Sequence, residues 1–532
     1  MSERLWWQDG VVYQIYPRSF MDSNSDGVGD LEGIRRRLDH LAWLGIDAVW
    51  LSPISPSPMA DFGYDVADYC DVEPLFGDLA AFDRLQDEAR QRGIRLILDW
   101  VPNHTSDQHA WFQESRSGRS SPKRDWYVWR DPKPDGSPPN NWQSVFGGGA
   151  WEWDEASGQS YLHSFLKEQP DLDWRNPEVV EAMHDVLRFW LDRGVGGFRI
   201  DVIHKIAKDP ELRDNPLHES GHPGYLGQRH VHDENHPDTQ EYLRGIRRVL
   251  NEYDARMTVG EVFIVDPKVA ASYYVNGEGL HLAFNFAFLR APWSADTFRE
   301  ETEAFEAALP GGCWPDLVLS NHDVPRHASR YDDPVLGEAR ARVAATMLLT
   351  LRGTPFLYYG EEIGMRNVAI PDDQILDPVG IHIHPAVGRD GERTPMQWSG
   401  GSGAGFSDET PWLPIGPDSD ERNVEAQRDD PASLLCLYRD LLALRRATPA
   451  LQRGDYRSLD APEDVFAFER RADASRVLVA LNFSGGERRV KLGAGTVRGG
   501  LRTVHGTLLP ERADEIHLAP SEAAVLVVDA LD

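Results

Sequence analysis

The sequence has 532 residues, too many for one compact core, and this length predicts roughly two to four domains. Acidic residues outnumber basic ones by 86 to 55, and the net charge of -31 excludes nucleic acid and anionic membrane surfaces as expected partners. Three cysteines in no pairwise motif exclude a disulfide framework and a thiolate metal site. Because the N-terminus lacks a signal-peptide pattern and no apolar run reaches membrane-spanning length, we expect a cytoplasmic enzyme.

From the N-terminus to about residue 360, short β-branched and aromatic runs alternate with amphipathic helical patterns. A helix is predicted over 31–44, ending at Gly45, and another over 82–92, ending at Gly93. Repeated strand-helix units with glycine stops are typical of a parallel sheet, and eight of them predict an α/β fold, a (β/α)8 TIM barrel. The predicted strands are 11–16, 48–51, 96–101, 197–201, 257–262, 281–286, 316–320 and 355–359.

The pattern is interrupted after the third strand and changes again after Gly454. The interruption is rich in Pro, Gly, Trp and Asn, and loops of this length are usually functional or small domains. A second irregular stretch follows the eighth strand, and alternating strands at 465–468, 477–482 and 524–528 predict a small antiparallel β domain. We therefore expect barrel domain A at 1–103 and 174–454, an inserted domain B at 104–173, and a C-terminal domain C at 455–532.

Two charged side chains lie in the apolar strand predicted at 197–201. Side chains of a strand alternate between its faces, so Arg199 and Asp201 share one face while Phe198 and Ile200 share the other. Burying a charge is costly unless it is paired. The pair is therefore either a structural ion pair or part of an active site.

Other predicted strands end in the same kind of residue. The third strand leads into Asp99 to His104, the fifth into Glu261, and the seventh into His322 and Asp323. In a parallel barrel the ligand site lies at the C-terminal ends of the strands. These carboxylates and histidines are therefore expected to converge on one mouth.

The segments 99–104, 197–201, 260–261 and 321–323 resemble the four conserved regions of the α-amylase superfamily, glycoside hydrolase family 13. The segments 14–20, 169–174 and 388–398 resemble its oligo-1,6-glucosidase and α-glucosidase branch. The resemblance covers nearly the whole chain. It implies a barrel with a domain B inserted after the third strand and a C-terminal domain C.

The same resemblance implies a role for each matching position. Asp201 would be the nucleophile, Glu261 the general acid and base, and Asp323 the third carboxylate. A retaining mechanism would place the two reacting carboxyl groups about 5 to 5.5 Å apart, and Arg199 is expected to lower the pKa of Asp201. The implied substrate-binding residues are Asp61, Tyr64, His104, Phe146, Phe165, Arg199, His322 and Arg389. Phe146 and Phe165 have packing as their alternative role.

The loop from Asp22 to Asp30 carries oxygen ligands at alternate positions, with glycines between them. It is similar to the first part of an EF-hand loop but has Gly33 in place of the bidentate Glu, so an ordinary acidic turn is the alternative. The branch resembled here implies structural Ca2+ at this place and no organic cofactor. The implied ligands are Asp22, Asn24, Asp26, Val28 and Asp30.

The resemblance implies an exo-acting α-glucosidase on short neutral oligosaccharides or disaccharides, with some glucosyl transfer. Val202, directly after Asp201, favours α-1,6 linkages in that branch, although Val is also common in strands for packing reasons. The alternatives are an α-1,4-preferring α-glucosidase, a glucosyl-transfer enzyme or sucrose isomerase, and a non-catalytic glucosidase-like partner protein. We expect a monomer or weak homodimer.

Overall fold

The computed structural model describes residues 5–219 and 221–529 of the chain. At its centre an eight-stranded sheet has the strand order β10-β11-β1-β2-β3-β7-β8-β9, and each paired neighbour is parallel. The predicted TIM barrel with eight strands is confirmed. The strands are β1 Val12–Ile15, β2 Ala48–Leu51, β3 Arg95–Trp100, β7 Gly197–Ile200, β8 Met257–Gly260, β9 Leu282–Ala283, β10 Asp316–Val318 and β11 Thr354–Tyr358.

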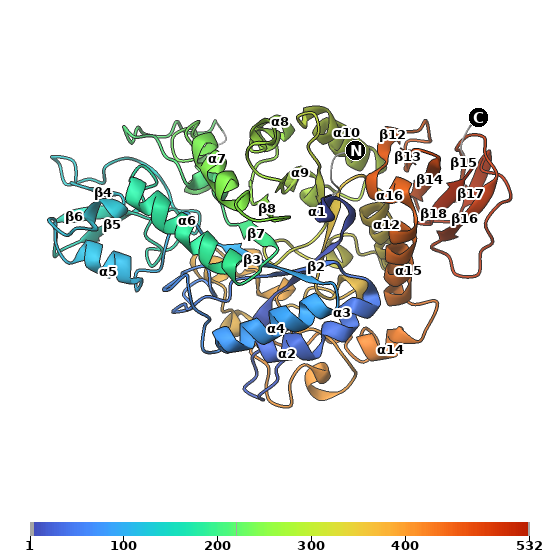
Figure 1. The fold of residues 1–532 in the computed structure, drawn as a ribbon, viewed down its shortest axis with the longest axis horizontal. Helices are drawn as coiled ribbons and strands as arrows, with labels where there is room; N and C mark the ends of the chain where they lie inside the picture. The colour runs from blue at the N-terminus through green and yellow to red at the C-terminus, as the bar shows by residue number, and fades with distance from the viewer. Residues whose placement is uncertain (1–4, 220, 530–532) are drawn as a thin grey trace.

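Amphipathic helices connect these strands (Figure 1). Their starts follow local chemistry: Asp78 accepts a hydrogen bond from the Ala81 N–H at the N-terminus of α4, and Asn176 caps α6 in the same way. The barrel helices are α1 Trp6–Asp9, α2 Leu31–Arg36, α3 Leu38–Leu44, α4 Leu79–Gln91, α6 Pro177–Asp192, α7 Thr239–Leu250, α8 Pro267–Ser272, α9 Phe286–Arg290, α10 Ala295–Ala308, α11 His327–Arg330 and α12 Gly337–Thr350.

Two of the predicted elements differ from the structure. The single helix expected over 31–44 is divided into α2 and α3, because Arg37 leaves the helical conformation at φ -102° and ψ 3°. The strand expected over 281–286 is only two residues long, since Asn285 caps the start of α9 by accepting from the Phe288 N–H. Neither change alters the order of strands around the barrel.

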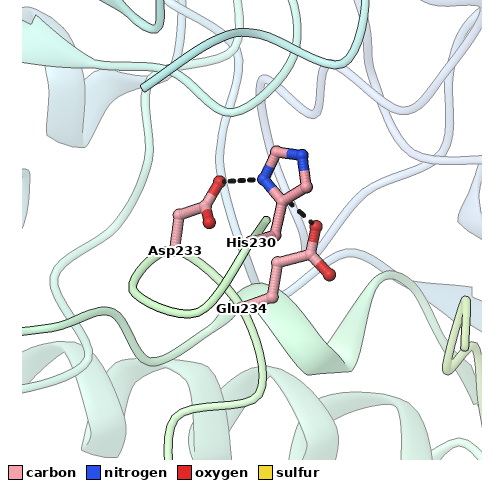
Figure 2. Close-up of side chains that lie close together, drawn as sticks. All are labelled: His230, Asp233 and Glu234. Atoms are coloured by element: carbon pink, nitrogen blue, oxygen red, sulfur yellow. Dashed lines mark hydrogen bonds and ion pairs between the residues drawn. The ribbon is translucent and has the colours of Figure 1, made fainter. Parts of the chain in front are cut away.

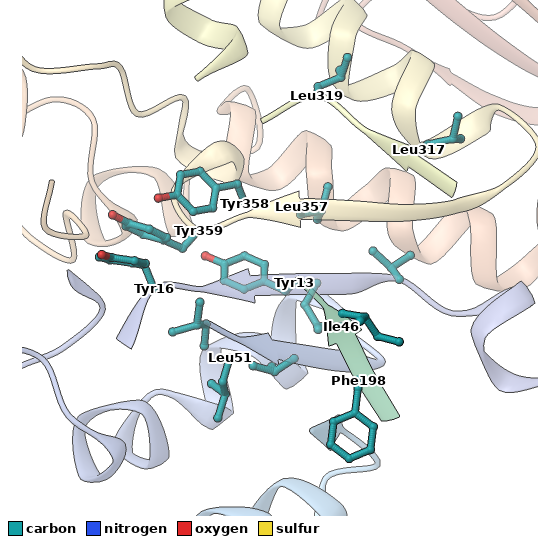
Figure 3. Close-up of a cluster of buried hydrophobic side chains, with 14 of the residues drawn as sticks. Tyr13, Tyr16, Ile46, Leu51, Phe198, Leu317, Leu319, Leu357, Tyr358 and Tyr359 are labelled. Atoms are coloured by element: carbon teal, nitrogen blue, oxygen red, sulfur yellow. The ribbon is translucent and has the colours of Figure 1, made fainter. Parts of the chain in front are cut away.

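The core is divided by the alternation of side chains along the strands. Val12, Trp50 and Phe356 pack together in one buried cluster, while their chain neighbours Tyr13 and Leu51 belong to a second, larger cluster. Figure 3 shows part of this second cluster, which combines side chains from β1, β2, β7, β10 and β11. Because hydrophobic burial contributes roughly 25 cal/mol per Å2, these layers fix the barrel on which the strand ends are held.

A small antiparallel sheet is inserted between β3 and β7. Its strands have the order β4-β6-β5. The bounds are α5 Ala110–Arg116, β4 Trp129–Arg130, β5 Trp151–Asp154 and β6 Gln159–Leu162. This sheet lies at one end of the molecule and the C-terminal strands at the other (Figure 1).

The chain after β11 is irregular before it enters the C-terminal sheets. Four helices, α13 Pro378–His382, α14 Val424–Arg428, α15 Leu434–Ala447 and α16 Pro449–Arg453, lie in this part. The C-terminal sheets are antiparallel, with the orders β12-β13-β14-β18-β16 and β15-β17. Their strands are β12 Asp455–Ser458, β13 Val465–Ala472, β14 Ser475–Asn482, β15 Arg488–Lys491, β16 Val497–Arg502, β17 Glu515–Leu518 and β18 Ala523–Val528.

Over residues 5–219 and 221–529, none of the helices combines the length and the apolar character that a bilayer crossing requires.

Candidate active site

The ends of β3, β7 and β8 bring three carboxylates to one guanidinium. Arg199 Nη1 lies 2.8 Å from Asp99 Oδ1 and 2.6 Å from Asp201 Oδ1. Its Nη2 lies 2.7 Å from Glu261 Oε2. Arg199 is 1% exposed, and Asp201 and Glu261 are each 5% exposed. On their predicted shared face Arg199 and Asp201 therefore form a buried ion pair. Asp99 and Glu261 also contact Arg199.

One positive charge against three buried carboxylates disfavours full ionisation of the group. Burial raises the pKa of Asp201 well above its ordinary value, and the opposing effect of Arg199 does not cancel this. Burial likewise raises the pKa of Asp99 to about 6. Arg199 lowers the pKa of Asp201 as expected, but burial and the neighbouring carboxylates outweigh this effect.

A second arginine joins the loops after β2, β10 and β11. Arg389 lies 3.0 Å from Asp61 Oδ1, 2.9 Å from Asp323 Oδ1 and 2.6 Å from Asp377 Oδ1. Arg393 also contacts Asp323, with 2.9 Å between Nη2 and Oδ1. Burial alone would raise the pKa of Asp323, but His322 and the two arginines lower it below its ordinary value. Asp323 is therefore held as a carboxylate.

Tyr64 contacts both predicted histidines, His104 and His322, as well as Asp99. The Tyr64 hydroxyl lies 3.0 Å from Asp99 Oδ2 and 2.6 Å from His322 Nε2, and the two rings stack with centroids 5.4 Å apart. Burial lowers the pKa of His104 to about 4, which makes it a neutral imidazole. His322 exposes none of its surface, so it lies behind Tyr64 and Asp323.

These side chains surround one cavity of about 230 Å3. That volume is below the roughly 300 to 1,000 Å3 of most ligand pockets and suits a small substrate. The structure brings ten of the predicted site residues to its lining; Arg199 and His322 are outside it. The ten are Asp61, Tyr64, His104, Phe146, Phe165, Asp201, Val202, Glu261, Asp323 and Arg389.

Val202 lies on this lining because the strand ends in a sharp turn. Its backbone is in the left-handed region at φ 31°, which is strained for a β-branched residue. The turn leaves the Val202 N–H 3.2 Å from Glu261 Oε2 and the side chain 8% exposed. Val202 also packs with Phe146 and Phe165 in a small apolar cluster at the cavity. Val202 therefore lies where its side chain can contact a bound sugar.

The predicted calcium loop forms a tight turn. Asp22 accepts hydrogen bonds from three backbone N–H groups of the loop, and Asp30 caps α2 through the Gly33 N–H. Asn24 Nδ2 lies 3.1 Å from Asp26 Oδ2, so these two side chains lie side by side. The side chains of Asp22, Asn24, Asp26 and Asp30 offer oxygen atoms to a metal ion, and oxygen is the ligand type that hard cations take.

A different group, His230, Asp233 and Glu234, brings its ligand atoms within 4.8 Å of one another, close enough to hold a metal ion (Figure 2). It lies in the loop after β7. No such site was predicted there.

Several residues of the site were not predicted as such. Asp377 is fully buried and bonds Arg389, and Gln169 Nε2 lies 3.1 Å from both Asp61 Oδ2 and His104 Nε2. Arg393 follows Arg389 by four residues in the same motif, which was a usable signal. Asp377 lies in irregular sequence with no period, so nothing marked it.

A family model described as "Alpha amylase, catalytic domain" matches residues 14–454 of the chain. The chain belongs to the α-amylase family. This assignment agrees with the barrel, with the carboxylates at its strand ends and with the resemblance of the four segments. The chain is a glycoside hydrolase of the α-glucosidase and oligo-1,6-glucosidase type.

Two curated α-amylase-family relatives match almost end to end. A probable α-glucosidase of Rhizobium meliloti is 46% identical over 497 residues, covering 91% of this chain and 90% of the relative. An oligo-1,6-glucosidase of Parageobacillus thermoglucosidasius is 41% identical, covering 91% of each chain.

Two solved structures superpose closely on this chain. The α-glucosyl transfer enzyme XgtA superposes with a TM-score of 0.94 at 42% identity, covering 99% of this chain and 100% of the other. The trehalulose synthase MutB of Pseudomonas mesoacidophila superposes with a TM-score of 0.90 at 35% identity, covering 99% and 100%. Relatives named as glucosidases, a glucosyl transfer enzyme and a trehalulose synthase thus match the chain at 35% to 46% identity.

Proposed function

We propose that the protein is a retaining, exo-acting α-glucosidase that releases terminal glucose from short α-glucosides. The observation that carries this proposal is the pair Asp201 and Glu261, two buried carboxyl groups on opposite nitrogens of one guanidinium. Glycoside hydrolysis needs one carboxylic acid to protonate the leaving oxygen and one carboxylate to attack the anomeric carbon. In the proposal Glu261 is that acid and Asp201 is that carboxylate.

In this mechanism Asp201 attacks the anomeric carbon and forms a glycosyl-enzyme. Glu261 gives its proton to the leaving oxygen, and then takes a proton from the water or alcohol that releases the sugar. Asp323 is held as a carboxylate by His322 and two arginines and accepts hydrogen bonds from sugar hydroxyls. His104, a neutral imidazole, donates or accepts at the same ring, and Arg199 orients the reacting carboxylates.

The exo mode is supported by the Asp61–Arg389 pair on the cavity lining. The pair also bonds Asp323 and Asp377, so these four charged groups form one ion-pair network at the cavity. A second sugar on that side would have to break these buried ion pairs, which is costly. One terminal glucose unit therefore fits between the Arg389 group and the reacting carboxylates.

The proposal also covers which linkage the enzyme prefers and whether it transfers glucose to acceptors other than water. Val202 on the lining supports a lean toward α-1,6 linkages, and several relatives are named oligo-1,6-glucosidase. Some glucosyl transfer is expected, because an alcohol can replace water in the second step. A trehalulose synthase matches the chain at 35% identity, so sucrose isomerisation is the alternative to hydrolysis.

Structural calcium in the Asp22–Asp30 loop belongs to the same proposal. The oxygen donors of Asp22, Asn24, Asp26 and Asp30, with the Val28 carbonyl, suit a hard cation. Bound there, Ca2+ would neutralise the carboxylates of a tight turn. The loop contributes no residue to the lining of the cavity, so its role would be stability.

The direct test is hydrolysis of nitrophenyl α-glucoside with the anomeric form of the first product followed by NMR. The proposal requires nitrophenol release and α-glucose as the first product. Asp201→Ala is expected to lower the rate by roughly five or more powers of ten while the far-UV circular dichroism stays unchanged. Release of β-glucose first, or near-parental turnover by Asp201→Ala, contradicts the proposal. Absence of any turnover favours the non-catalytic partner.

A further inference from the structure

The loop between β7 and α7 contains a charged group that the proposed chemistry does not use. Figure 2 shows His230 between Asp233 and Glu234. His230 Nδ1 lies 2.9 Å from Asp233 Oδ2, and the other Asp233 oxygen accepts a hydrogen bond from Asn215 at 2.7 Å. His230 Nε2 lies 2.9 Å from the Tyr225 carbonyl oxygen. The histidine and the aspartate are therefore already bonded on both sides.

Glu234 is also occupied, by a buried cation. Lys205 is 2% exposed, follows Asp201 by four residues, and its Nζ lies 3.0 Å from Glu234 Oε1. The Tyr225 hydroxyl donates to the same oxygen. A buried ammonium needs such a partner, and its positive charge repels a metal ion at this place. The contacts of these side chains with one another and with Lys205 thus explain their spacing without a metal ion.

The group fixes Tyr225 beside the reacting carboxylates. The Tyr225 ring stacks on His230 with centroids 3.8 Å apart and planes 26° apart, and Lys205 Nζ lies 5.0 Å from the ring centroid. Tyr225 and Lys205 line the same cavity as Glu261, together with the half-exposed Phe263. The loop therefore supplies part of the lining that also contains Glu261, the residue that protonates the leaving group if the proposed function is right.

We propose that Lys205, Glu234 and Tyr225 form a clamp that holds the loop between β7 and α7 against the cavity. The clamp restricts the leaving group to a single sugar-sized unit. The inference rests on the proposed function and adds a determinant of chain length to it. The clamp acts by position: the ion pair anchors the loop to the segment after Asp201, and the tyrosine ring blocks further extension. The small cavity volume of about 230 Å3 agrees with this restriction.

The test compares isomaltose with isomaltotriose in the full-length protein. Tyr225→Ala is expected to raise the ratio of kcat/KM for isomaltotriose over isomaltose by roughly tenfold, mainly through a lower KM for the trisaccharide. Lys205→Met is expected to move the ratio in the same direction, since it releases the loop without removing the ring. The matched control is Leu226→Ala, the next residue of the loop, which is 69% exposed and should leave the ratio unchanged.

Each outcome bears on the clamp or on the proposed function separately. Ratios unmoved in both Tyr225→Ala and Lys205→Met, with an active wild type, overturn the clamp alone. A wild type inactive on both sugars overturns the proposed function instead. If Tyr225→Ala does not fold, Tyr225→Phe, which loses only the hydroxyl bond to Glu234, and Lys205→Met decide the matter.

Calorimetric titration with zinc chloride separates the clamp from a metal site. The clamp predicts no stoichiometric binding that depends on this group. Zinc binding that is present in the wild type and absent in His230→Gln would overturn it.

Discussion

Arg389 and Asp61 are 328 residues apart in the sequence, and their side chains form a salt bridge of 3.0 Å on the cavity lining. Both side chains are buried or nearly so, with 13% and 5% of their surfaces exposed. The bridge joins the loop after β2 to the irregular stretch after β11. In the proposed function this bridge between two distant segments closes the cavity beyond the terminal glucose and accounts for an exo mode of action.

The first prediction tests this closure. The wild type should hydrolyse nitrophenyl α-glucoside but not a nitrophenyl α-maltoside whose non-reducing end is blocked. Asp61→Ala should lower kcat/KM on the glucoside roughly 10- to 100-fold, because a charged hydrogen-bond partner is lost. Asp68→Ala, an exposed residue of the same loop, is the control. Release of nitrophenol from the blocked substrate at a comparable rate would show that the enzyme is endo-acting.

The second prediction concerns linkage. Val202→Thr should shift the ratio of kcat/KM for isomaltose over maltose toward maltose, since a polar group replaces a methyl at the leaving-group side. A methyl-sized change in a pocket is worth about 1 to 3 kcal/mol of discrimination. We also expect the wild type to hydrolyse isomaltose at least as efficiently as maltose. Steady-state kinetics on both disaccharides measure this; a strong wild-type preference for maltose, or an unmoved ratio, refutes the role of Val202.

The third prediction is a pH dependence of stability. Burial raises the pKa of Glu392 to about 8, with Arg393 opposing the shift. The folded state then holds a proton that the unfolded chain loses near its ordinary pKa of about 4.3. The resulting stability is present at low pH and is lost as the pH rises toward 8.

Glu392→Gln, which is always neutral, should therefore match the wild type near pH 4.5 and exceed it by roughly 2 to 4 kcal/mol at pH 8.5. Urea unfolding across this pH range measures the difference, with the exposed Glu409→Gln as control. A difference that does not grow with pH refutes the assignment. The Asn367 amide bond to Glu392 Oε2 can be kept by the glutamine oxygen.

The fourth prediction concerns the Asp22–Asp30 loop. Calcium held only by the folded loop stabilises by mass action and takes no part in the chemistry. Chelation should lower the Tm while initial rates at low temperature stay the same, and in Asp26→Ala added calcium should no longer raise the Tm. Differential scanning calorimetry and rate measurements before and after chelation decide this. Immediate loss of turnover on chelation, reversed by calcium, would mean that the metal serves catalysis.

The sequence was sufficient to predict the positions of side chains that depend on local structure. Asp201 and Glu261 directly follow β7 and β8, so the rule that ligands bind at the C-terminal ends of barrel strands brought them together. The alternation of side chains along a strand predicted that Arg199 and Asp201 share one face, and the two side chains form an ion pair. The eight-strand count followed from repeated patterns of the same kind.

What the sequence could not predict depends on contacts between distant segments. Asp377 meets Arg389 only because an irregular stretch folds back over the barrel, and no period marks such a contact. The pKa of Asp201 was misjudged because it depends on burial and on Asp99, 102 positions earlier in the numbering. The Lys205–Glu234 pair joins residues 29 positions apart through a loop with no regular structure.

The most direct test of the account is to trap the glycosyl-enzyme. In Glu261→Gln, α-glucosyl fluoride should still react at the first step, because fluoride leaves without acid assistance, while the missing base slows the second step. Mass spectrometry of the digested protein should then find one glucosyl residue on the peptide that contains Asp201. A label on another carboxylate, or rapid turnover of the fluoride by this variant with no covalent intermediate, would contradict the account.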